Sequence, residues 1–536
     1  MFRILVADKL AQEGLDILQA EKDVTVDVKV GLKPDELAKV VGEYDGLIIR
    51  SGAKVTAEVL EHSGRLKAIA RAGVGVDNVD VPTATRKGVV VMNTPDGNTI
   101  STAEQTITLM FGLARHLYKA CDSLKKGEWE RNKFMGRQLE GKTLGVVGLG
   151  RVGRAVAERA LGLGMRVVGF DPYFSPTESS FKGRVELVED VNALCKQCDY
   201  LTVHTPLTEQ TKGIVGAEQL GLMKKSAAVI NCARGGIIDE EALYQALTAG
   251  TISAAALDVY SEEPPKDRRL VELENVVCTP HLGASTKEAQ VVVAIDAAKQ
   301  VLKVLKTGEV VNAVNAPGFD ASLAKVLRPY ASLAQRMGKI LGSVTQGRTR
   351  KLKVVYSGEM AELEAGAVTV SLLVGLLQGQ SDEPVNAVNA RLFIKERGIE
   401  VEEIKSHAAG DFATLIEATL ETDKEQHSVT GTVFSRSLPR IVAIDDYRME
   451  MVPAGRMIIS FNDDKPGVIG GVGNLFGQHK INIGSLTFGR KTQTQKAVLV
   501  LALDQEPSQA ILREMSELPF MDGVNYIELP ELETEA

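Results

Sequence analysis

Three residues suited to proton transfer and anion binding follow three apolar runs in the middle of the chain. Arg234 lies in NCARGGIIDEEAL, Glu263 in LDVYSEEPP and His281 in CTPHLGAST. A histidine can take a proton from a hydroxyl group and return it, while a carboxylate bonded to the imidazole orients it and favours its protonated form. An arginine can grip a substrate carboxylate with two parallel hydrogen bonds. Each residue alone has an ordinary structural explanation, but all three follow expected strands of one parallel sheet, so we expect them to meet at its carboxyl edge.

The element that would supply a redox partner lies upstream, in TLGVVGLGRVGRAVAERALGLGMRVVGFDPY at 143–173. It reads as a strand, a Gly-x-Gly-x-x-Gly turn, a helix and a second strand that ends in Asp171. The glycines of the turn are Gly148, Gly150 and Gly153. They permit a tight turn, close approach of a pyrophosphate and close helix packing, and the helix N-terminus favours phosphate. Asp171 is placed to accept a hydrogen bond from a ribose 2′-hydroxyl and no arginine directly follows it, so we predict NAD rather than NADP, and hydride transfer.

Short apolar strands alternate with amphipathic helices on both sides of this unit, which indicates parallel, doubly wound α/β sheets. A helix expected at 286–308 is long enough to return to the start of the chain. We therefore expect a Rossmann domain inserted in a flavodoxin-like domain, followed by an α+β intervening domain and a ferredoxin-like βαββαβ module. The expected domains are 1–98 with 285–316 for substrate, 99–284 for NAD, 317–453 for the intervening domain and 454–536 for the last module.

Three local features complete this expected organisation. A long amphipathic helix is expected over about 99–126, ahead of the glycine-rich unit. Pro317 and Gly318 mark the expected boundary before the intervening domain. The hexapeptide VNAVNA occurs at 311–316 and again at 385–390, and because no longer repeat surrounds it we interpret it as coincidence.

The composition of the chain excludes several classes of protein. Its 536 residues carry 44% hydrophobic and 25% charged residues with a net charge of −8, and no basic run, which argues against a nucleic-acid partner. No apolar stretch is long enough to span a membrane, and the N-terminus runs directly into an expected strand, so we expect neither a membrane partner nor a signal peptide. Five cysteines indicate a reducing cytoplasm, and the pair Cys195 and Cys198 is interpreted as partly buried thiols. No cluster predicts a metal site.

The ordered set GLGRVG, Asp171, HTPLT, NCARGG, EEPP and HLGAST resembles the NAD-dependent D-2-hydroxyacid dehydrogenase family, over at least residues 45–315. The resemblance implies that Arg234 anchors the substrate carboxylate, Glu263 orients the histidine and His281 is the acid/base. Glu263 is preferred to Glu262 because the acid of the family directly precedes the prolines. Further cofactor contacts implied at matching positions are Arg151, Val152, Thr205, Cys232, Asp258 and Gly283.

Within that family, the stretches IIRSGAKVT, RAGVGVDNVDVPTATRKG and VMNTPDGNTIS are similar to the long form of the D-3-phosphoglycerate dehydrogenases. This likeness implies oxidation of D-3-phosphoglycerate, whose two anionic groups suit arginines in a cleft. The substrate contacts that it implies are Arg50, Arg71, Val74, Gly75 and Asn98. Surface charge is the alternative for the two arginines. A homodimer or homotetramer is implied, with Trp129 at a subunit interface.

The segment FNDDKPGVIGGVGNLFGQHKINIGS at 461–485 resembles ACT domains, which bind an amino acid where two copies pair. That resemblance implies an L-serine effector near Asp464 and Asn482, with pairing alone as the alternative. A reductase for hydroxypyruvate or glyoxylate is a second enzymatic interpretation of the same residues. An NAD-sensing corepressor is a third, although the ACT-like module and the lack of a basic arm argue against it.

Overall fold

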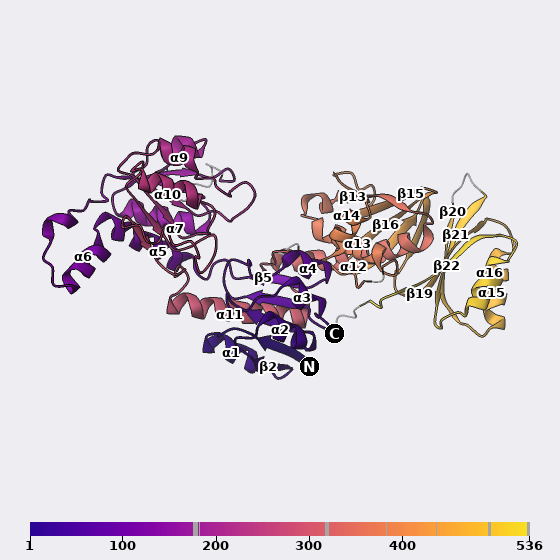
Figure 1. Cartoon of the computed structure of the whole chain (residues 1–536). Helices are drawn as coiled ribbons and strands as arrows, with labels where there is room; N and C mark the ends of the chain where they lie inside the picture. Colours follow the sequence, from indigo (N-terminus) through magenta and orange to yellow (C-terminus); the bar gives the residue numbers. More distant parts are fainter. Residues whose placement is uncertain are drawn as a thin grey trace.

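Four sheets organise the chain in the computed structural model, which describes residues 1–174, 181, 183–316, 321–381, 383–435, 437–490 and 495–532, without the side chains of 321–325. Figure 1 shows the sheet that holds β5 in the middle of the molecule, with the body of α7 and α10 on one side and the C-terminal elements on the other. The expected boundary at Pro317 and Gly318 lies outside the described residues. Among the described residues, no helix is both long and apolar enough to cross a bilayer.

The first sheet is parallel with the order β2-β1-β3-β4-β5, which is the flavodoxin-like order expected from the sequence. Its strands are β1 Phe2–Val6, β2 Val24–Val28, β3 Gly46–Ile49, β4 Ala68–Arg71 and β5 Val90–Asn93. The helices of the same segment are α1 Gln12–Gln19, α2 Pro34–Val40, α3 Ala57–Glu61 and α4 Val81–Arg86. The strands β1, β3, β4 and β5 are largely buried, as is typical of a parallel sheet, whereas the edge strand β2 is partly exposed.

The long helix that follows the NAD segment returns to this first sheet. It is α11, Lys287–Thr307, which confirms the helix expected at 286–308. Thr286 caps its N-terminus by accepting a hydrogen bond from Ala289 N, and Gly308 ends it with a φ of 69°. A Cβ on Gly14 of α1 would lie 2.8 Å from the Ala294 carbonyl oxygen, so the two helices pack closely.

The second sheet is parallel with the order β12-β11-β10-β9-β6-β7-β8. Its strands are β6 Thr143–Val147, β7 Arg166–Phe170, β8 Val185–Leu187, β9 Tyr200–Val203, β10 Ala228–Asn231, β11 Ala254–Leu257 and β12 Val276–Cys278. Its helices include α7 Arg151–Gly162, α8 Val191–Cys195, α9 Ala217–Leu222 and α10 Glu240–Thr248. The strand order reverses between β6 and β9, and at such a switch point the carboxyl ends of the strands leave a crevice for a ligand. This confirms the expected Rossmann domain.

The single helix expected over 99–126 is wrong, because the structure has two helices there. They are α5, Thr99–Ala114, and α6, Leu117–Lys125, separated by His116 with a φ of 52°. Arg137 N donates to the Ala114 carbonyl oxygen at 2.8 Å, so a returning segment takes the acceptor that a continuous helix would use. Figure 1 shows that α6 consequently projects from the body of the second sheet.

The third sheet belongs to the intervening segment and has the order β14-β13-β15-β16-β17-β18. Its strands are β13 Thr349–Gly358, β14 Glu400–Ser406, β15 Thr414–Thr422, β16 Gln426–Phe434, β17 Leu438–Ile444 and β18 Tyr447–Met451. Its helices are α12 Ala321–Val344, α13 Gly366–Leu377 and α14 Ala390–Glu396. A Cβ on Gly338 would lie 2.0 Å from the Leu372 carbonyl oxygen, which explains how α12 and α13 lie in backbone contact.

The fourth sheet is antiparallel with the order β20-β21-β19-β22. In chain order its elements are β19 Gly455–Asp463, α15 Val468–Gln478, β20 Ile483–Arg490, β21 Lys496–Leu503, α16 Gln509–Ser516 and β22 Met521–Leu529. This is the βαββαβ order that the sequence predicts.

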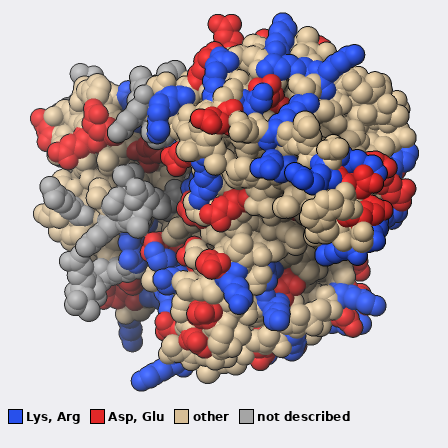
Figure 2. Space-filling view, turned by 90° about the vertical axis from the view of Figure 1, so that its left-hand side faces the viewer, with Lys and Arg blue, Asp and Glu red and all other residues tan. Residues whose placement is uncertain are grey.

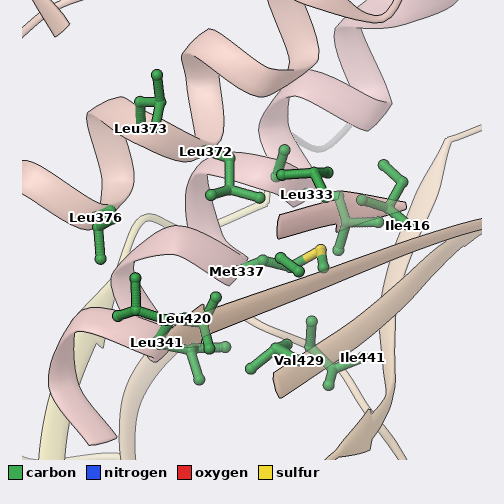
Figure 3. Packing of buried hydrophobic residues seen from close by; sticks show 14 of the residues in the cluster. Leu333, Met337, Leu341, Leu372, Leu373, Leu376, Ile416, Leu420, Val429 and Ile441 are labelled. Atoms are coloured by element: carbon green, nitrogen blue, oxygen red, sulfur yellow. The ribbon is translucent and has the colours of Figure 1, made fainter. Parts of the chain in front are cut away.

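The third and fourth sheets share one hydrophobic core. Side chains alternate along β19, so that Met457 and Ile459 pack with the intervening domain while Ile458 packs with α15 and α16. Figure 3 shows the centre of the shared cluster, where Met337 and Leu341 of α12 lie between α13 and the strands. Polar contacts follow the same interface: Arg336 of α12 donates to the Pro530 and Glu531 carbonyl oxygens at 3.2 Å. The fourth sheet is therefore covered on both faces, by the intervening domain on one side and by α15 and α16 on the other.

The two VNAVNA segments contact the same turn of the first domain, between α4 and β5. In the first copy, Asn315 accepts from Val91 N at 2.9 Å and donates to the Val89 carbonyl oxygen at 2.9 Å. In the second copy, Asn386 donates to the Gly88 carbonyl oxygen at 2.8 Å. The sequence interpretation of the repeat as coincidence did not foresee this shared position. Both copies attach the C-terminal half to one turn of the first domain. We call these contacts the asparagine clamp.

Charged side chains are mixed on the surface at the end of the molecule that carries the second sheet. Figure 2 shows lysine and arginine side chains interspersed with aspartate and glutamate over this face. A nucleic-acid interface needs a continuous basic strip, and the described side chains of this face do not form one.

Candidate active site

The carboxyl ends of the second sheet bring His281 and Glu263 into direct contact. His281 Nδ1 lies 2.7 Å from Glu263 Oε2, and the other oxygen, Oε1, accepts from Tyr260 N at 3.1 Å. An ionised carboxylate only accepts hydrogen bonds, so Nδ1 carries the hydrogen and Nε2 is the nitrogen left to exchange a proton with a substrate. The two residues meet as the sequence predicts.

Glu263 remains ionised at neutral pH. Its partial burial raises the pKa of the carboxyl, but the hydrogen bonds from His281 and Tyr260 N and the charge of Arg234 outweigh burial and leave the pKa below its ordinary value. A lowered pKa means that the pair contributes stability at neutral pH and loses it as the pH falls through that lowered value. The orienting carboxylate is thus in its charged form under physiological conditions.

Asp258 organises the turn that presents His281. Its carboxylate, fully buried, accepts from Thr279 Oγ1 at 2.5 Å, Leu282 N at 2.7 Å and Gly283 N at 2.7 Å. The turn requires this support because His281 has a φ of 54°, a left-handed conformation that is costly for a residue with a side chain. Asp258 and Gly283, predicted as cofactor contacts, therefore lie directly beneath the histidine.

Arg234 reaches the same edge from the end of β10, and Gly235 explains its position. A Cβ on Gly235 would lie 2.0 Å from the carbonyl carbon of Tyr260, so only glycine lets this segment lie against the loop that carries Glu263. Arg234 Nη1 donates to the Ala233 carbonyl oxygen at 2.7 Å, and Nε lies 3.1 Å from Asp77 Oδ2 of the first domain. The predicted triad is thus assembled on one edge and faces the first domain.

Arg50 and Arg71 approach this edge from the ends of β3 and β4. Burial, and then the charges of Arg234 and Arg50, lower the pKa of Arg71 to about 10, which still leaves it charged at neutral pH. Arg71 lies over Gly73, where a Cβ would be 1.7 Å from its Nη1. Three guanidinium groups therefore gather where the first and second domains face each other, a place that we call the cleft, and such a group of charges suits an anionic substrate.

The backbone segment at Val74 and Gly75, just after Arg71, is fixed by contacts with side chains. Asn93 Nδ2 donates to the Val74 carbonyl oxygen at 2.5 Å, and Gly75 lies directly beneath Arg234. Asn98, the last of the predicted substrate residues, has a buried Oδ1 with no hydrogen-bond partner among the described residues. A buried acceptor without a donor is costly, so this atom is suited to a ligand or a water molecule.

The glycine-rich turn fits a dinucleotide. Gly148 has a φ of 91°, and a Cβ on Gly153 would lie 1.9 Å from the Gly148 carbonyl oxygen, so these two glycines close the turn onto α7. A Cβ on Gly150 would meet no atom within 4 Å, which leaves that side of the turn open to a pyrophosphate. Thr205 at the end of β9 has a buried Oγ1 without a partner among the described residues. NAD would lie across this crevice, with the triad beyond it.

Two of the other predicted cofactor contacts flank the crevice and one lies beneath it. Arg151, the first residue of α7, pairs through Nε with Asp96 Oδ1 at 2.5 Å, while Val152 packs half-buried on the core below. Cys232 is buried, and burial raises the pKa of its thiol to about 12. It therefore packs as a neutral thiol.

Asp171 contacts the turn itself and has an arginine nearby. Its Oδ2 accepts from Leu149 N at 2.8 Å and its Oδ1 accepts from Tyr173 N at 2.9 Å. Arg154 Nε donates to the Leu149 carbonyl oxygen at 2.8 Å, and its guanidinium lies over the Phe174 ring. No arginine directly follows Asp171 in the sequence, whereas the fold brings this arginine, one helical turn beyond Gly150, to the same turn.

Asp464 and Asn482 do not form a site within one chain, and Cys195 and Cys198 are thiols, as interpreted from the sequence. Asp464 receives two hydrogen bonds from Arg490 at 2.8 Å, whereas Asn482 donates to Asp504 at 2.7 Å. The registers Asp463↔Lys496 and Ile483↔Leu503 place them at opposite ends of the fourth sheet. Cys195 and Cys198 are buried free thiols whose pKa is raised by burial to about 12, so they are unreactive at neutral pH.

Asp77 contacts Arg234 of the triad, and the sequence did not predict this contact. It lies in GVGVDNVD, and nothing in that local pattern indicates that its carboxylate crosses the cleft to Arg234. In the described part of the chain, no three histidine, cysteine or acidic side chains are grouped closely enough to hold a metal ion.

Comparisons with known proteins agree with this geometry. The family described as "D-isomer specific 2-hydroxyacid dehydrogenase, NAD binding domain" matches residues 107–283, and "D-3-phosphoglycerate dehydrogenase intervening domain" matches residues 326–445. The D-3-phosphoglycerate dehydrogenase of Methanocaldococcus jannaschii is 43% identical over 99% of this chain and 100% of its own length.

Solved structures resemble more than half of the chain. The TT0316 protein of Thermus thermophilus is 36% identical with a TM-score of 0.54, over 58% of this chain and 99% of that one. A glyoxylate reductase from Paecilomyes thermophila is 28% identical with a TM-score of 0.54, over 58% of this chain and 98% of that one. The relative that matches at full length is a D-3-phosphoglycerate dehydrogenase. The domain matched at residues 107–283 is an NAD-binding domain. The chain therefore belongs to the D-3-phosphoglycerate dehydrogenases, within the D-isomer-specific 2-hydroxyacid dehydrogenase family.

Proposed function

We propose that the protein oxidises D-3-phosphoglycerate to 3-phosphohydroxypyruvate with NAD, the first step of L-serine biosynthesis. The observation that carries this proposal is the set of three arginines, from two domains, beside the His281–Glu263 pair. A 2-hydroxy acid with a phosphate at its far end has two anionic groups for them to bind. The full-length likeness to D-3-phosphoglycerate dehydrogenases supports the same substrate.

In this reaction the side chains bind, orient and move one proton. Arg234 holds the carboxylate, which fixes the neighbouring carbon, and Arg50 and Arg71 hold the phosphate. Bound NAD supplies the hydride acceptor. His281 Nε2 takes the proton of the substrate hydroxyl, and the charge of Glu263 stabilises the imidazolium that results.

A steady-state assay with phosphorylated and unphosphorylated substrates tests this function. We expect D-3-phosphoglycerate to exceed D-glycerate in kcat/KM by about a hundredfold or more, since two charge-assisted contacts are lost without the phosphate. Equal values for the two substrates would instead favour a hydroxypyruvate or glyoxylate reductase, for which the glyoxylate reductase likeness gives a structural reason. Absence of any turnover would favour the corepressor.

Replacing Asp171 by alanine should relax the preference for NAD over NADP by about tenfold or more. The carboxylate repels a 2′-phosphate, and its removal leaves the cationic Arg154, whose Nε donates to the Leu149 carbonyl oxygen, beside the glycine-rich turn. The measurement is the ratio of kcat/KM for the two cofactors. Asp171→Asn is the matched control for the loss of charge alone, because its amide oxygen can still accept from Leu149 N. An unchanged ratio in both variants would assign discrimination to another group.

L-serine as an effector is a further part of this proposal. The C-terminal module has the ACT-like order, and Asp464 and Asn482 lie at opposite ends of its sheet, so a site using both needs two chains. Millimolar L-serine should slow turnover, and Asn482→Ala should abolish the inhibition without altering kcat. If serine neither binds by calorimetry nor slows the enzyme, this part of the proposal is wrong.

The projecting helix supports a homo-oligomer, either a dimer or a tetramer. Leu117 and Leu124 of α6 and the neighbouring Trp129 are more than half exposed, with Trp129 at 77%. Large apolar side chains at such exposure are typical of a surface that another chain covers. Sedimentation of the wild type would give the number of chains.

A cytoplasmic location is also part of the proposal, and the proposed pathway and the free thiols support it.

A further inference from the structure

Asp77 makes an ion pair across the cleft with the residue that anchors the substrate. Its Oδ2 lies 3.1 Å from Arg234 Nε, although Asp77 lies between β4 and β5 of the first sheet and Arg234 between β10 and β11 of the second. The carboxylate is 72% exposed, whereas the arginine is 28% exposed. The contact therefore sits at the rim of the cleft, on the outer side of the guanidinium.

The loop that carries Asp77 is held in place on both sides. Asn78 Nδ2 donates to the Arg50 and Ala53 carbonyl oxygens at 2.7 and 2.6 Å, and Val79 N donates to the Val76 carbonyl oxygen at 2.9 Å. A Cβ on Gly75 would lie 1.8 Å from Arg234 Nη2, so the guanidinium lies directly on the backbone of the same loop. The loop thus determines where the guanidinium can lie.

The remaining hydrogen bonds define how Arg234 faces the substrate. Nε is engaged by Asp77, and one Nη1 hydrogen is engaged by the Ala233 carbonyl oxygen. An arginine has five N–H donors in a rigid plane, so three donors remain, all on the two terminal nitrogens. Those donors match a carboxylate that approaches end-on.

Asp77 also offsets repulsion between the arginines. Burial and the charges of Arg234 and Arg50 destabilise the charged form of Arg71 and lower its pKa. The charge of Asp77 acts in the opposite direction and raises that pKa. A positioned anion near two guanidinium groups lowers the cost of holding them together before substrate arrives.

We propose that Asp77 is a positioning residue for substrate recognition, which fixes the plane of Arg234 across the cleft so that its terminal nitrogens receive the substrate carboxylate. This inference rests on the proposed function only in taking a 2-hydroxy or 2-oxo acid as substrate. Because the carboxylate is common to phosphorylated and unphosphorylated substrates, Asp77 acts on both alike.

The test measures KM and kcat in the direction of reduction, with 3-phosphohydroxypyruvate and with hydroxypyruvate. Asp77→Ala should raise KM for both substrates by the same factor, about threefold to tenfold, while KM for NADH stays within twofold. Asp77→Asn, which keeps an oxygen for Arg234 Nε, should recover most of the loss. Glu104→Gln is the matched control, because Glu104 pairs with Arg159 at 3.3 Å away from the cleft and its loss should change neither KM.

A coupling measurement separates positioning from a general loss of structure. In an Arg234→Lys background, Asp77→Ala should add little to KM, since an ammonium group has no plane to orient. Full additivity of the two changes would overturn the inference, as would a KM effect confined to the phosphorylated substrate or shared by NADH. If the wild type shows no preference for phosphate, the proposed substrate fails, yet the equal effect on hydroxypyruvate still tests Asp77.

Discussion

His281→Ala should lower kcat by about 10²–10⁴-fold while leaving the affinity for NAD nearly unchanged. The substitution removes Nε2, the ring nitrogen of His281 that is left for the substrate hydroxyl, since Nδ1 is occupied by Glu263 at 2.7 Å. General acid/base catalysis by a positioned side chain typically contributes a factor of this size. The glycine-rich turn, which we propose as the NAD site, is not touched by the substitution. Stopped-flow turnover and a fluorescence titration with NADH measure the two quantities separately.

A second histidine provides the control for this experiment. His479 Nε2 lies 2.8 Å from Glu514, so it forms the same kind of pair between α15 and α16, outside the cleft. His479→Ala should therefore retain wild-type kcat in the absence of serine. Turnover of His281→Ala within tenfold of the wild type would remove His281 from the proposed role.

Asp258→Ala should lower both the stability of the second domain and the rate of turnover. The substitution leaves Leu282 N, Gly283 N and Thr279 Oγ1 without their buried acceptor. Hydrogen bonds to a buried charge are worth about 1.5–3 kcal/mol each, so a loss of about 3–5 kcal/mol is expected after partial relaxation. The turn would also lose the support for the left-handed conformation of His281. Denaturant unfolding and kcat, measured on the folded fraction, report the two effects.

The variant Asp199→Ala is the control that separates a loss of stability from a loss of turnover. Its carboxylate accepts from Thr143 N at 2.9 Å and pairs with Lys224 at 2.8 Å, but it lies ahead of β9, at the opposite edge of the same sheet. Asp199→Ala should therefore reduce stability and leave kcat of the folded enzyme unchanged. If Asp258→Ala behaved in the same way, Asp258 would not position the histidine.

The parts of this structure that follow from local chemistry were predictable from the sequence. Gly148 supplies the left-handed residue of the turn and Gly153 permits its close approach to α7, and Arg234 and His281 follow strands whose carboxyl ends share an edge. The reversal of strand order at β6 and β9 then requires a crevice where the predicted cofactor residues lie.

The parts that failed depend on contacts between distant segments. The break before α6 arises because Arg137 N takes the Ala114 carbonyl oxygen, and no pattern within 99–126 reveals that donor. Asp77 and Arg154 were missed for the same reason, since their roles arise only when separate strands and helices meet. The effector site at Asp464 and Asn482 stays a prediction, because the antiparallel register separates the two residues along one chain and a shared site would need a second copy.

The core shared by the third and fourth sheets has a consequence for how the C-terminal half moves. Met457 and Ile459 are buried against the intervening domain, so a chain cut after residue 453 would expose apolar strand faces on one fragment and helix faces on the other. The two C-terminal domains are thus a single rigid arm rather than two hinged parts. This arm meets the rest of the chain at the asparagine clamp, beside the turn that leads into β5, so a displacement of the arm would act first on that turn.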